Sequence, residues 1–177
     1  LIVNRMSVID PSQVDVHDFE QVDSQQVQKH WQELLHHIAS IKSPQVRAIA
    51  EIFVEDPQIA TALQAAPAGV KAHHSYRGGL LAHVVEMMYL ADGISERYAH
   101  VDRDLLLLGA MLHDIGKLEE LLFEDEMTYS DPGQLLGHLV QGVRMLDRKL
   151  PAIEDRLGSK LDEAMLWRVQ HMIVSHH

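Results

Sequence analysis

From Ser24 onward the apolar residues of the chain recur at the spacing of an α-helix, not at the alternating spacing of a strand. Ser24 can cap a first helix. The pairs Ser43-Pro44 and Asp56-Pro57 can each start another, because a proline suits the first helical turn after a capping residue. A break at Ala66-Pro67 ends this series. The faces predicted to be buried in the first two helices are Val27, Trp31, Leu34, Leu35 and Ile38, then Val46, Ile49, Ala50 and Phe53.

Longer helices are predicted in the rest of the chain. Residues 118–130 lack a helical pattern, and the stretch 123–129 can form a small hairpin. The spacing of apolar residues predicts helices over about 79–98, 102–113, 131–150 and 161–177, with Asp131-Pro132 capping the third of these. The sequence therefore predicts an all-α fold, a helical bundle with at most a small hairpin.

The two ends of the chain differ from this pattern. Leu1–Ile9 favours a strand that has no evident partner in the rest of the sequence, and a lone strand is not stable by itself. Residues 10–23 are polar and include Pro11, as a linker does. We therefore expect residues 1–23 to be a strand remnant of an upstream domain followed by a linker, and residues 24–177 to form one helical domain. The last predicted helix has neither cap nor stop at His177, so we expect this domain to be truncated.

Composition adds limits to this picture. A chain of 177 residues with 46% hydrophobic residues can build one globular core. No apolar run is long enough to cross a bilayer, and the absence of cysteine excludes disulfides, thiolate zinc sites and thiol nucleophiles. We expect a cytoplasmic location. The net charge of −11 argues against binding nucleic acid over a broad surface, which needs many Lys and Arg contacts to phosphate.

Candidate chemistry is concentrated at the end of the apolar run 105–112. His113-Asp114 follows this run directly and leads into Ile115-Gly116-Lys117. Burying an imidazole and a carboxylate at the mouth of a core helix costs free energy unless both are paired or bind a metal. This pair is therefore the strongest candidate for a functional site.

Other histidines also lie at apolar edges of predicted helices: His83, His138 and the pair His176-His177. A single His on an apolar face is more often a hydrogen-bonded core residue than a ligand. Taken jointly with His113-Asp114, the set favours metal ligands that converge from facing helices, as in other helical bundles. First-sphere ligands lie about 2.0–2.3 Å from their ion, so His83 and His138 should lie within about 7 Å of Asp114.

The remaining histidines have linker or helix-surface settings and are not predicted to be ligands: His17, His30, His36, His37, His100 and His171. His73-His74 precedes the first ligand helix and could contact substrate or lie in a solvated loop.

Lys117 could be a solvated residue, hold a phosphate oxygen or protonate a leaving group, and Lys71 and Arg77 are weaker candidates for the same task. The sequence contains no phosphate-binding glycine loop and no H-E-x-x-H helix.

The order of these residues resembles the HD superfamily of metal-dependent phosphohydrolases, whose pattern is a first His, an adjacent His-Asp, further His residues and a final Asp. The doubled late histidines resemble its binuclear branch, and within it bacterial 3′-to-5′ exoribonucleases that place an OB-type domain before the HD domain. The resemblance covers about Gln25 to the end. It rests on the strings 66–68, 73–83, 112–121, 136–138 and 175–177.

The resemblance implies an all-α HD fold that holds two divalent ions bridged by Asp114. His83 and His113 would hold one ion together with the family's closing Asp. The other ion would be held by His138, His176 and His177. Nitrogen and oxygen ligands without sulfur suit Mn, Fe, Co or Mg rather than a thiolate-selected metal, and we expect Mn, with Fe, Co, Mg or Ni as alternatives. The closing Asp should follow His177, where the given sequence ends, and we expect the chain to be cut short there.

The resemblance also implies the activity: hydrolysis of single-stranded RNA or oligonucleotides from the 3′ end. Asp114 and Lys117 would be the catalytic residues, and His73, His74, Arg77 and Lys117 the substrate contacts. The strand Leu1–Ile9 would be the remnant of the OB-type domain. With an acidic charge and few aromatic residues, the given chain should bind RNA weakly by itself. A membrane partner is not expected, and a homo-oligomer stays open.

Three alternatives are compatible with a histidine-rich helical bundle. A cyclic-dinucleotide or nucleotide phosphohydrolase would share the site, but the Gly-Tyr-Pro element of the cyclic-dinucleotide group does not follow Gly116-Lys117. A hemerythrin-like di-iron bundle needs carboxylates at helical spacing, whereas Gly142 stands four residues after His138. A non-catalytic metal-binding interaction domain is the third.

Overall fold

The computed structural model describes residue 10 and residues 24–70, 74–123 and 128–177. The predicted strand Leu1–Ile9 and nearly all of the predicted linker lie outside the described residues. The described elements are helices α1 (Ser24–Ser40), α2 (Pro44–Glu55), α3 (Pro57–Ala65), α4 (Gly79–Arg97), α5 (Arg103–Leu112), α6 (Lys117–Glu120), α7 (Asp131–Leu157) and α8 (Glu163–Val174), and strands β1 (Leu121–Leu122) and β2 (Thr128–Tyr129). The predicted all-α fold is confirmed. None of the described helices is long and apolar enough to cross a membrane.

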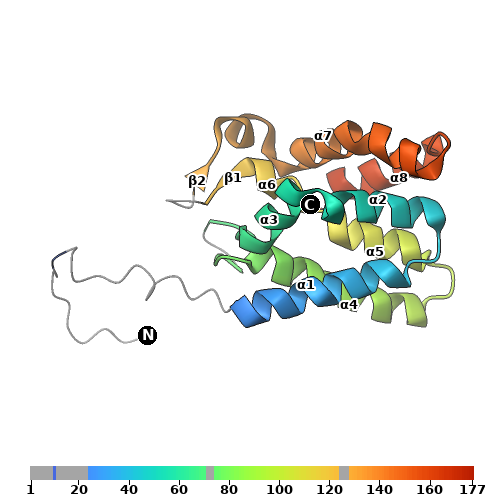
Figure 1. Cartoon of the computed structure of the whole chain (residues 1–177), viewed down its shortest axis with the longest axis horizontal. Helices are drawn as coiled ribbons and strands as arrows, with labels where there is room; N and C mark the ends of the chain where they lie inside the picture. The colour runs from blue at the N-terminus through green and yellow to red at the C-terminus, as the bar shows by residue number, and fades with distance from the viewer. Residues whose placement is uncertain (1–9, 11–23, 71–73, 124–127) are drawn as a thin grey trace.

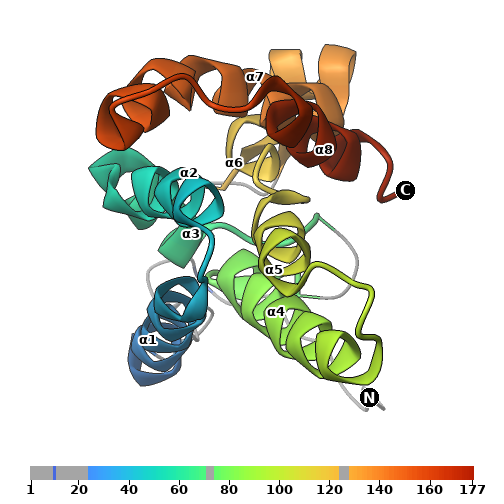
Figure 2. The same ribbon diagram turned by 90° about the vertical axis from the view of Figure 1, so that its right-hand side faces the viewer.

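The helices form a layered bundle. Figures 1 and 2 show α1 and α4 side by side at one side of the molecule and α7 with α8 at the opposite side, with α2 and α5 between them. The central helix α5 contacts α2, α4 and α8, so its apolar residues fill the core. Leu107, Leu108, Met111 and Leu112 of this helix are all buried. The end of α5 therefore lies inside the bundle, where the His113-Asp114 pair follows.

The predicted starts of α2 and α3 are confirmed. The Ser43 hydroxyl accepts from the N–H of Val46, and the Asp56 carboxylate accepts from the N–H groups of Gln58 and Ile59. Each such cap stabilises a helix by about 1 kcal/mol, because it satisfies an amide that has no partner within the helix. The predicted inward residues of α2 are all buried: Val46, Ile49, Ala50 and Phe53.

Helix α7 differs from its predicted bounds at both ends. Its N-cap is Ser130, whose hydroxyl accepts from Gly133 N–H, and not Asp131. The helix continues past Leu150 and through Pro151 to Leu157, where Gly158 caps it in the left-handed conformation. Ile153 is fully buried one half-turn after the proline. Packing of this residue against the core outweighs the local helix-breaking effect of proline.

The last helix and the hairpin also differ from prediction. Helix α8 ends at Val174 with Ser175 as its C-cap, so the predicted uncapped run to His177 is wrong. The hairpin exists, but it begins at Leu121, two residues before the predicted segment, and the short helix α6 occupies part of the stretch predicted to be irregular. Residues 123–127 connect β1 to β2, and of these residues 124–127 lie outside the described ranges.

His37 is the clearest error in the predicted surface. It was expected on an exposed helix face, but it is only 4% exposed. Its ring packs edge-on against Tyr89 of α4, with ring centroids 4.7 Å apart. Helix α4 covers the face of α1 that carries His37, a contact between distant segments that the local pattern does not reveal.

Candidate metal centre

Asp114 lies at the centre of a cluster of histidines. It follows His113, the C-cap of α5, whose backbone N–H donates to the carbonyl of Gly109. Only 3% of Asp114 is exposed. The buried end of α5 thus delivers a carboxylate into the middle of the bundle, where α4, α7 and α8 bring further ligand types.

One carboxylate oxygen of Asp114 faces two histidines. Its Oδ2 atom lies 3.5 Å from Nε2 of His83 and 3.3 Å from Nε2 of His113. The two imidazole Nε2 atoms are 3.1 Å apart. Ligand atoms of His83, His113 and Asp114 all lie within 4.8 Å of one another, close enough to hold one ion.

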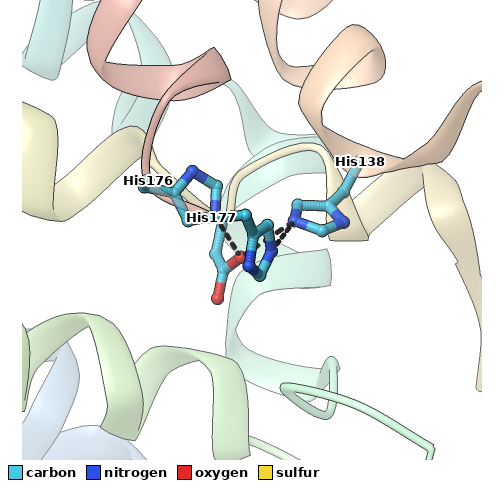
Figure 3. Close-up of side chains that lie close together, drawn as sticks. His138, His176 and His177 are labelled. Atoms are coloured by element: carbon cyan, nitrogen blue, oxygen red, sulfur yellow. Dashed lines mark hydrogen bonds and ion pairs between the residues drawn. The ribbon is translucent and has the colours of Figure 1, made fainter.

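The other oxygen faces the remaining histidines. Oδ1 of Asp114 lies 3.5 Å from Nε2 of His138 and 3.5 Å from Nε2 of His176. Nε2 of His138 lies 2.9 Å from Nε2 of His177. Figure 3 shows His138, from α7, meeting His176 and His177, which follow α8. Ligand atoms of these three histidines and Asp114 also lie within 4.8 Å of one another.

In three of these histidines the second ring nitrogen, Nδ1, lies at hydrogen-bond distance from an acceptor. Nδ1 of His113 lies 2.9 Å from the carbonyl of Ala110, and Nδ1 of His176 lies 2.8 Å from the carbonyl of Ile173. Nδ1 of His138 lies 3.2 Å from Oε1 of Glu120. In a neutral imidazole a proton on Nδ1 leaves the lone pair on Nε2, so these contacts orient Nε2 as a ligand toward Asp114.

A break in α7 places His138. Gly137 has φ 69° and ψ 166°, a conformation that side-chain-bearing residues rarely adopt, and it interrupts the helix. The next N–H, that of His138, is released from the helix and donates to Oε1 of Glu120 at 3.0 Å. A Cβ on Gly116 would lie 2.0 Å from the His138 carbonyl oxygen. Glycine at position 116 therefore lets the chain after Asp114 approach α7 closely enough to complete the cluster.

The cluster has the electrostatics of a cation site. Burial alone would raise the pKa of Asp114, but hydrogen bonds and charge from His113 and Lys117 outweigh it and hold the pKa well below its usual range. Burial lowers the pKa of His83 and of His176, which favours the neutral ligand form. Oδ1 of Asp114 and Nε2 of His176 are buried without a hydrogen-bond partner among the described residues. Buried atoms of this kind are costly unless a cation satisfies them, so the residues present fit a divalent metal.

Among the predicted substrate contacts, Lys117 and His74 lie near the cluster, whereas Arg77 does not line either hollow beside it. Lys117 is half-buried, and its Nζ lies 2.7 Å from Oδ2 of Asp114. The His74 ring lies 5.7 Å from the His83 ring, and its Nδ1 lies 3.1 Å from the Tyr76 hydroxyl. His73 and Lys71 lie outside the described residues. Arg77 is half-buried and is not among the described residues that line the two hollows beside the cluster.

These two hollows open on different sides of the cluster. The apolar hollow, of about 480 Å³, lies against His83, His113 and His176, with walls from α4, α5 and α8. The polar hollow, of about 510 Å³, lies against His138 and His177. Its other lining residues are Ala68, Gly69, Val70, Lys117, Glu120, Leu121 and Tyr129.

Two residues beside the cluster were not anticipated from the sequence. Glu120 orients His138, and Tyr129 lines the polar hollow. Glu120 follows another glutamate, so it had the pattern of a solvated charged pair, and Tyr129 stands in a short stretch with no regular pattern. The chain around His138 was predicted as an unbroken helix, so the break at Gly137 that lets Glu120 reach His138 was not anticipated either.

Comparison with known proteins agrees with this geometry. The HD domain family model matches residues 80–177, a segment that includes every histidine of the cluster and Asp114. The chain is 30% identical over 176 residues to the 3′-5′ exoribonuclease YhaM of Bacillus pumilus, covering 98% of this chain and 53% of that protein. It is 34% identical over 141 residues to the 3′-5′ exoribonuclease YhaM of Bacillus subtilis, covering 80% of this chain and 42% of that protein.

The match to these relatives is partial in length. The chain spans about half the length of the curated relatives it matches. No solved structure matches the chain. HD domains bind divalent metal ions, and the His/Asp cluster has the donors to hold them. From the family match and the arrangement of the cluster, we conclude that the chain belongs to the HD domain family.

Proposed function

We propose that the chain is the catalytic domain of a metal-dependent 3′-to-5′ exoribonuclease that hydrolyses phosphodiester bonds of single-stranded RNA. The observation that carries the proposal is the division of the Asp114 carboxylate, with Oδ2 facing His83 and His113 and Oδ1 facing His138 and His176. A carboxylate in this position can bridge two cations. The likeness to proteins named 3′-5′ exoribonuclease supports the choice of RNA as substrate.

Six residues would hold the ions. His83 and His113 would bind one ion with Oδ2 of Asp114, while His138, His176 and His177 would bind the other with Oδ1. Divalent ions bound there would lower the pKa of a coordinated water and polarise the phosphodiester. Imidazole and carboxylate donors without sulfur do not select a thiophilic metal, and we propose Mn²⁺ as the ion, with Fe, Co, Mg or Ni as alternatives.

The chain's own residues would do the positioning. Asp114 is ionised at neutral pH because the pKa of its carboxyl is held low, so it is ready to bind cations without losing a proton. Lys117 reaches Oδ2 of Asp114 and lines the polar hollow, so its ammonium can contact a phosphate oxygen there. Removing that contact would weaken the stabilisation of charge on the phosphoryl group.

Other features of the whole protein are part of the same proposal. We propose that residues 1–9 are the remnant of an OB-type domain and residues 10–23 the linker to the HD domain, because an OB-type domain supplies the positive groove and aromatic rings that single strands need. The acidic net charge of −11 supports this division of labour. A cytoplasmic location is consistent with this role and stays a prediction.

An assay with two substrates tests the proposal. The Mn²⁺-loaded chain, supplied with the closing Asp that the family pattern places after His177, should hydrolyse bis-p-nitrophenyl phosphate, which needs only the metal centre. It should also shorten a 5′-labelled single-stranded RNA stepwise from its 3′ end and release nucleoside monophosphates. Chelation with EDTA should abolish both activities. Hydrolysis of neither substrate by the loaded chain would contradict the proposed function, and cleavage of RNA at internal positions would contradict the exonuclease assignment.

A further inference from the structure

We propose that Tyr129 is the stacking face for a nucleobase next to the scissile phosphate, within the polar hollow beside the metal cluster. The inference rests on the proposed function, because it assumes a nucleic-acid substrate. It goes further by naming the residue that would bind a base and by predicting that this subsite does not read base identity.

The position of Tyr129 supports the proposal. The tyrosine is 44% exposed, and it lines the same hollow as His138, His177 and Lys117. The hollow, at about 510 Å³, is within the usual size range of small-ligand sites. An aromatic ring therefore shares one open hollow with the residues that would hold the phosphate.

The hairpin directs the ring toward the hollow. Tyr129 lies directly opposite Leu121 in the register of β1 and β2, and residues opposite each other in an antiparallel pair project to the same face. Leu121 is only 4% exposed and also lines the hollow. Leu121 thus forms the apolar floor, and the Tyr129 ring stands beside it with one side open to solvent.

The hairpin is tied to the metal cluster through the backbone. The N–H of Ser130, the residue after Tyr129, donates to the carbonyl of Glu120 at 2.9 Å, and its hydroxyl donates to the carbonyl of Glu119 at 2.7 Å. Oε1 of Glu120 in turn accepts from the N–H of His138. The backbone that carries Tyr129 is therefore held in a defined position relative to a candidate metal ligand.

The distribution of chemistry in the hollow matches a nucleotide. Lys117 and His138 lie toward the cluster, where a phosphate would bind, while Leu121 and Tyr129 offer an apolar floor and a ring for a base. The described residues that line this hollow include no Asn, Gln or Arg, and its Lys117 and Glu120 are already engaged with Asp114 and His138, so no side chain here is left to read a base edge. Stacking is tolerant of sequence because every base has a π-face.

The apolar hollow on the other side of the cluster fits a base less well. Its walls are Met87, Leu90, Ile94, Leu106 and Met172, and the described residues that line it include no Lys, Arg, Tyr, Phe or Trp. Beyond the candidate ligands His83, His113 and His176, its described lining offers neither a Lys or Arg for phosphate nor an aromatic ring for stacking. The polar hollow is therefore the better candidate for a nucleotide subsite.

Binding of oligoribonucleotides that lack one base tests the proposal without requiring hydrolysis. Fluorescence anisotropy with EDTA present would give the Kd of the full chain for a 5′-labelled RNA and for the same RNA with an abasic terminal or penultimate 3′ nucleotide. Wild type should bind the intact RNA roughly tenfold more tightly than at least one abasic RNA, the size expected for one stacked base. The preference should not change when the base at that position is changed.

Variants then separate stacking from folding of the hairpin. Tyr129→Phe should keep the preference for the intact RNA, because it keeps the ring. Tyr129→Leu should lose the preference while keeping an apolar partner for Leu121, and thermal unfolding checks that it is folded. Tyr98→Ala is the matched control, since Tyr98 is 52% exposed at the far end of α4 and does not line the polar hollow.

The outcomes separate this inference from the proposed function. Equal binding of intact and abasic RNA by wild type, or an unchanged preference in Tyr129→Leu, overturns the stacking site. A preference that depends on Tyr129, together with no phosphodiester hydrolysis by the Mn²⁺-loaded chain, supports the stacking site and contradicts the proposed function.

Discussion

Glu120 and His138 are joined by two contacts at one oxygen: Oε1 of Glu120 accepts from the backbone N–H of His138 at 3.0 Å and lies 3.2 Å from Nδ1 of the same residue. The two residues come from different elements, α6 and α7, and the contact depends on the helix break at Gly137. The glutamate thus fixes both the backbone and the ring of a candidate metal ligand.

Glu120→Ala should weaken metal binding, because the ring of His138 loses the acceptor that orients it. Loss of such an orienting group typically costs about 10- to 100-fold in metal affinity. Titration of the metal-free chain with Mn²⁺ measures the effect. The matched control is Glu119→Ala, which removes the neighbouring glutamate and its surface ion pair with Arg148. Equal metal affinity in wild type and Glu120→Ala would show that Glu120 does not act through His138.

Asp114→Ala should abolish both bound metal and phosphodiesterase activity, since each carboxylate oxygen faces a separate group of histidines. Elemental analysis after removal of free Mn²⁺ measures the metal, and hydrolysis of bis-p-nitrophenyl phosphate measures activity. His30→Ala and His100→Ala should change neither, because these histidines lie away from the cluster. Full hydrolysis by Asp114→Ala with added Mn²⁺ would refute the mechanism.

Lowering the pH should destabilise the fold partly through His37. Burial is the main cause that lowers the pKa of His37 below its ordinary value of 6.5, with Asp92 opposing the shift. Well above pH 6.5 the ring is neutral in both states. Below it the unfolded chain takes up a proton that the folded chain resists, so the free energy of unfolding falls as the pH decreases toward the folded-state pKa.

The variant His37→Phe isolates this contribution, because it keeps a ring against Tyr89 but cannot titrate. Urea unfolding at about pH 7.5 and about pH 5.5 should show a smaller loss of stability in the variant than in wild type, since the pH range spans the titration of an ordinary histidine. An equal loss in the two proteins would show that His37 is not responsible.

Gly116→Ala should destabilise the protein, because the new Cβ would lie 2.0 Å from the carbonyl oxygen of His138 and 2.5 Å from the N atom of Gly142. Both contacts are with backbone, so relief requires movement of α7, and overpacking of this kind costs about 1–3 kcal/mol or more. Gly93→Ala is the control, since nothing lies within 4 Å of its Cβ position on α4. That control should stabilise the helix by about 0.5–1 kcal/mol. Chemical denaturation of both variants measures the difference, and a neutral Gly116→Ala would contradict the close approach of these segments.

The fold could be predicted from the sequence where short-range signals decide it. Ser43-Pro44 and Asp56-Pro57 start helices because the capping oxygen and the proline lie within one turn of the amides they satisfy. The end of α7 was predicted wrongly, because the burial of Ile153 against distant helices outweighs Pro151. His37 was misplaced for the same reason, since Tyr89 of α4 covers it.

The candidate site was predictable to the extent that its residues are unusual in their local setting. His113 and Asp114 follow an apolar run, and the structure brings them together with His83, His138 and His176. Glu120 and Tyr129 have ordinary local settings, and only the folded chain brings them beside the cluster. Their roles depend on contacts that a pattern in one segment does not encode.

Anomalous diffraction from crystals of the chain grown with Mn²⁺ would locate the ions bound beside Asp114. We expect two peaks on opposite sides of the Asp114 carboxylate, about 3.5–4 Å apart as in other two-metal sites. One peak should lie among His83, His113 and Oδ2, and the other among His138, His176, His177 and Oδ1. No peak beside Asp114, or peaks bound only by residues outside this cluster, would contradict the proposed two-metal centre.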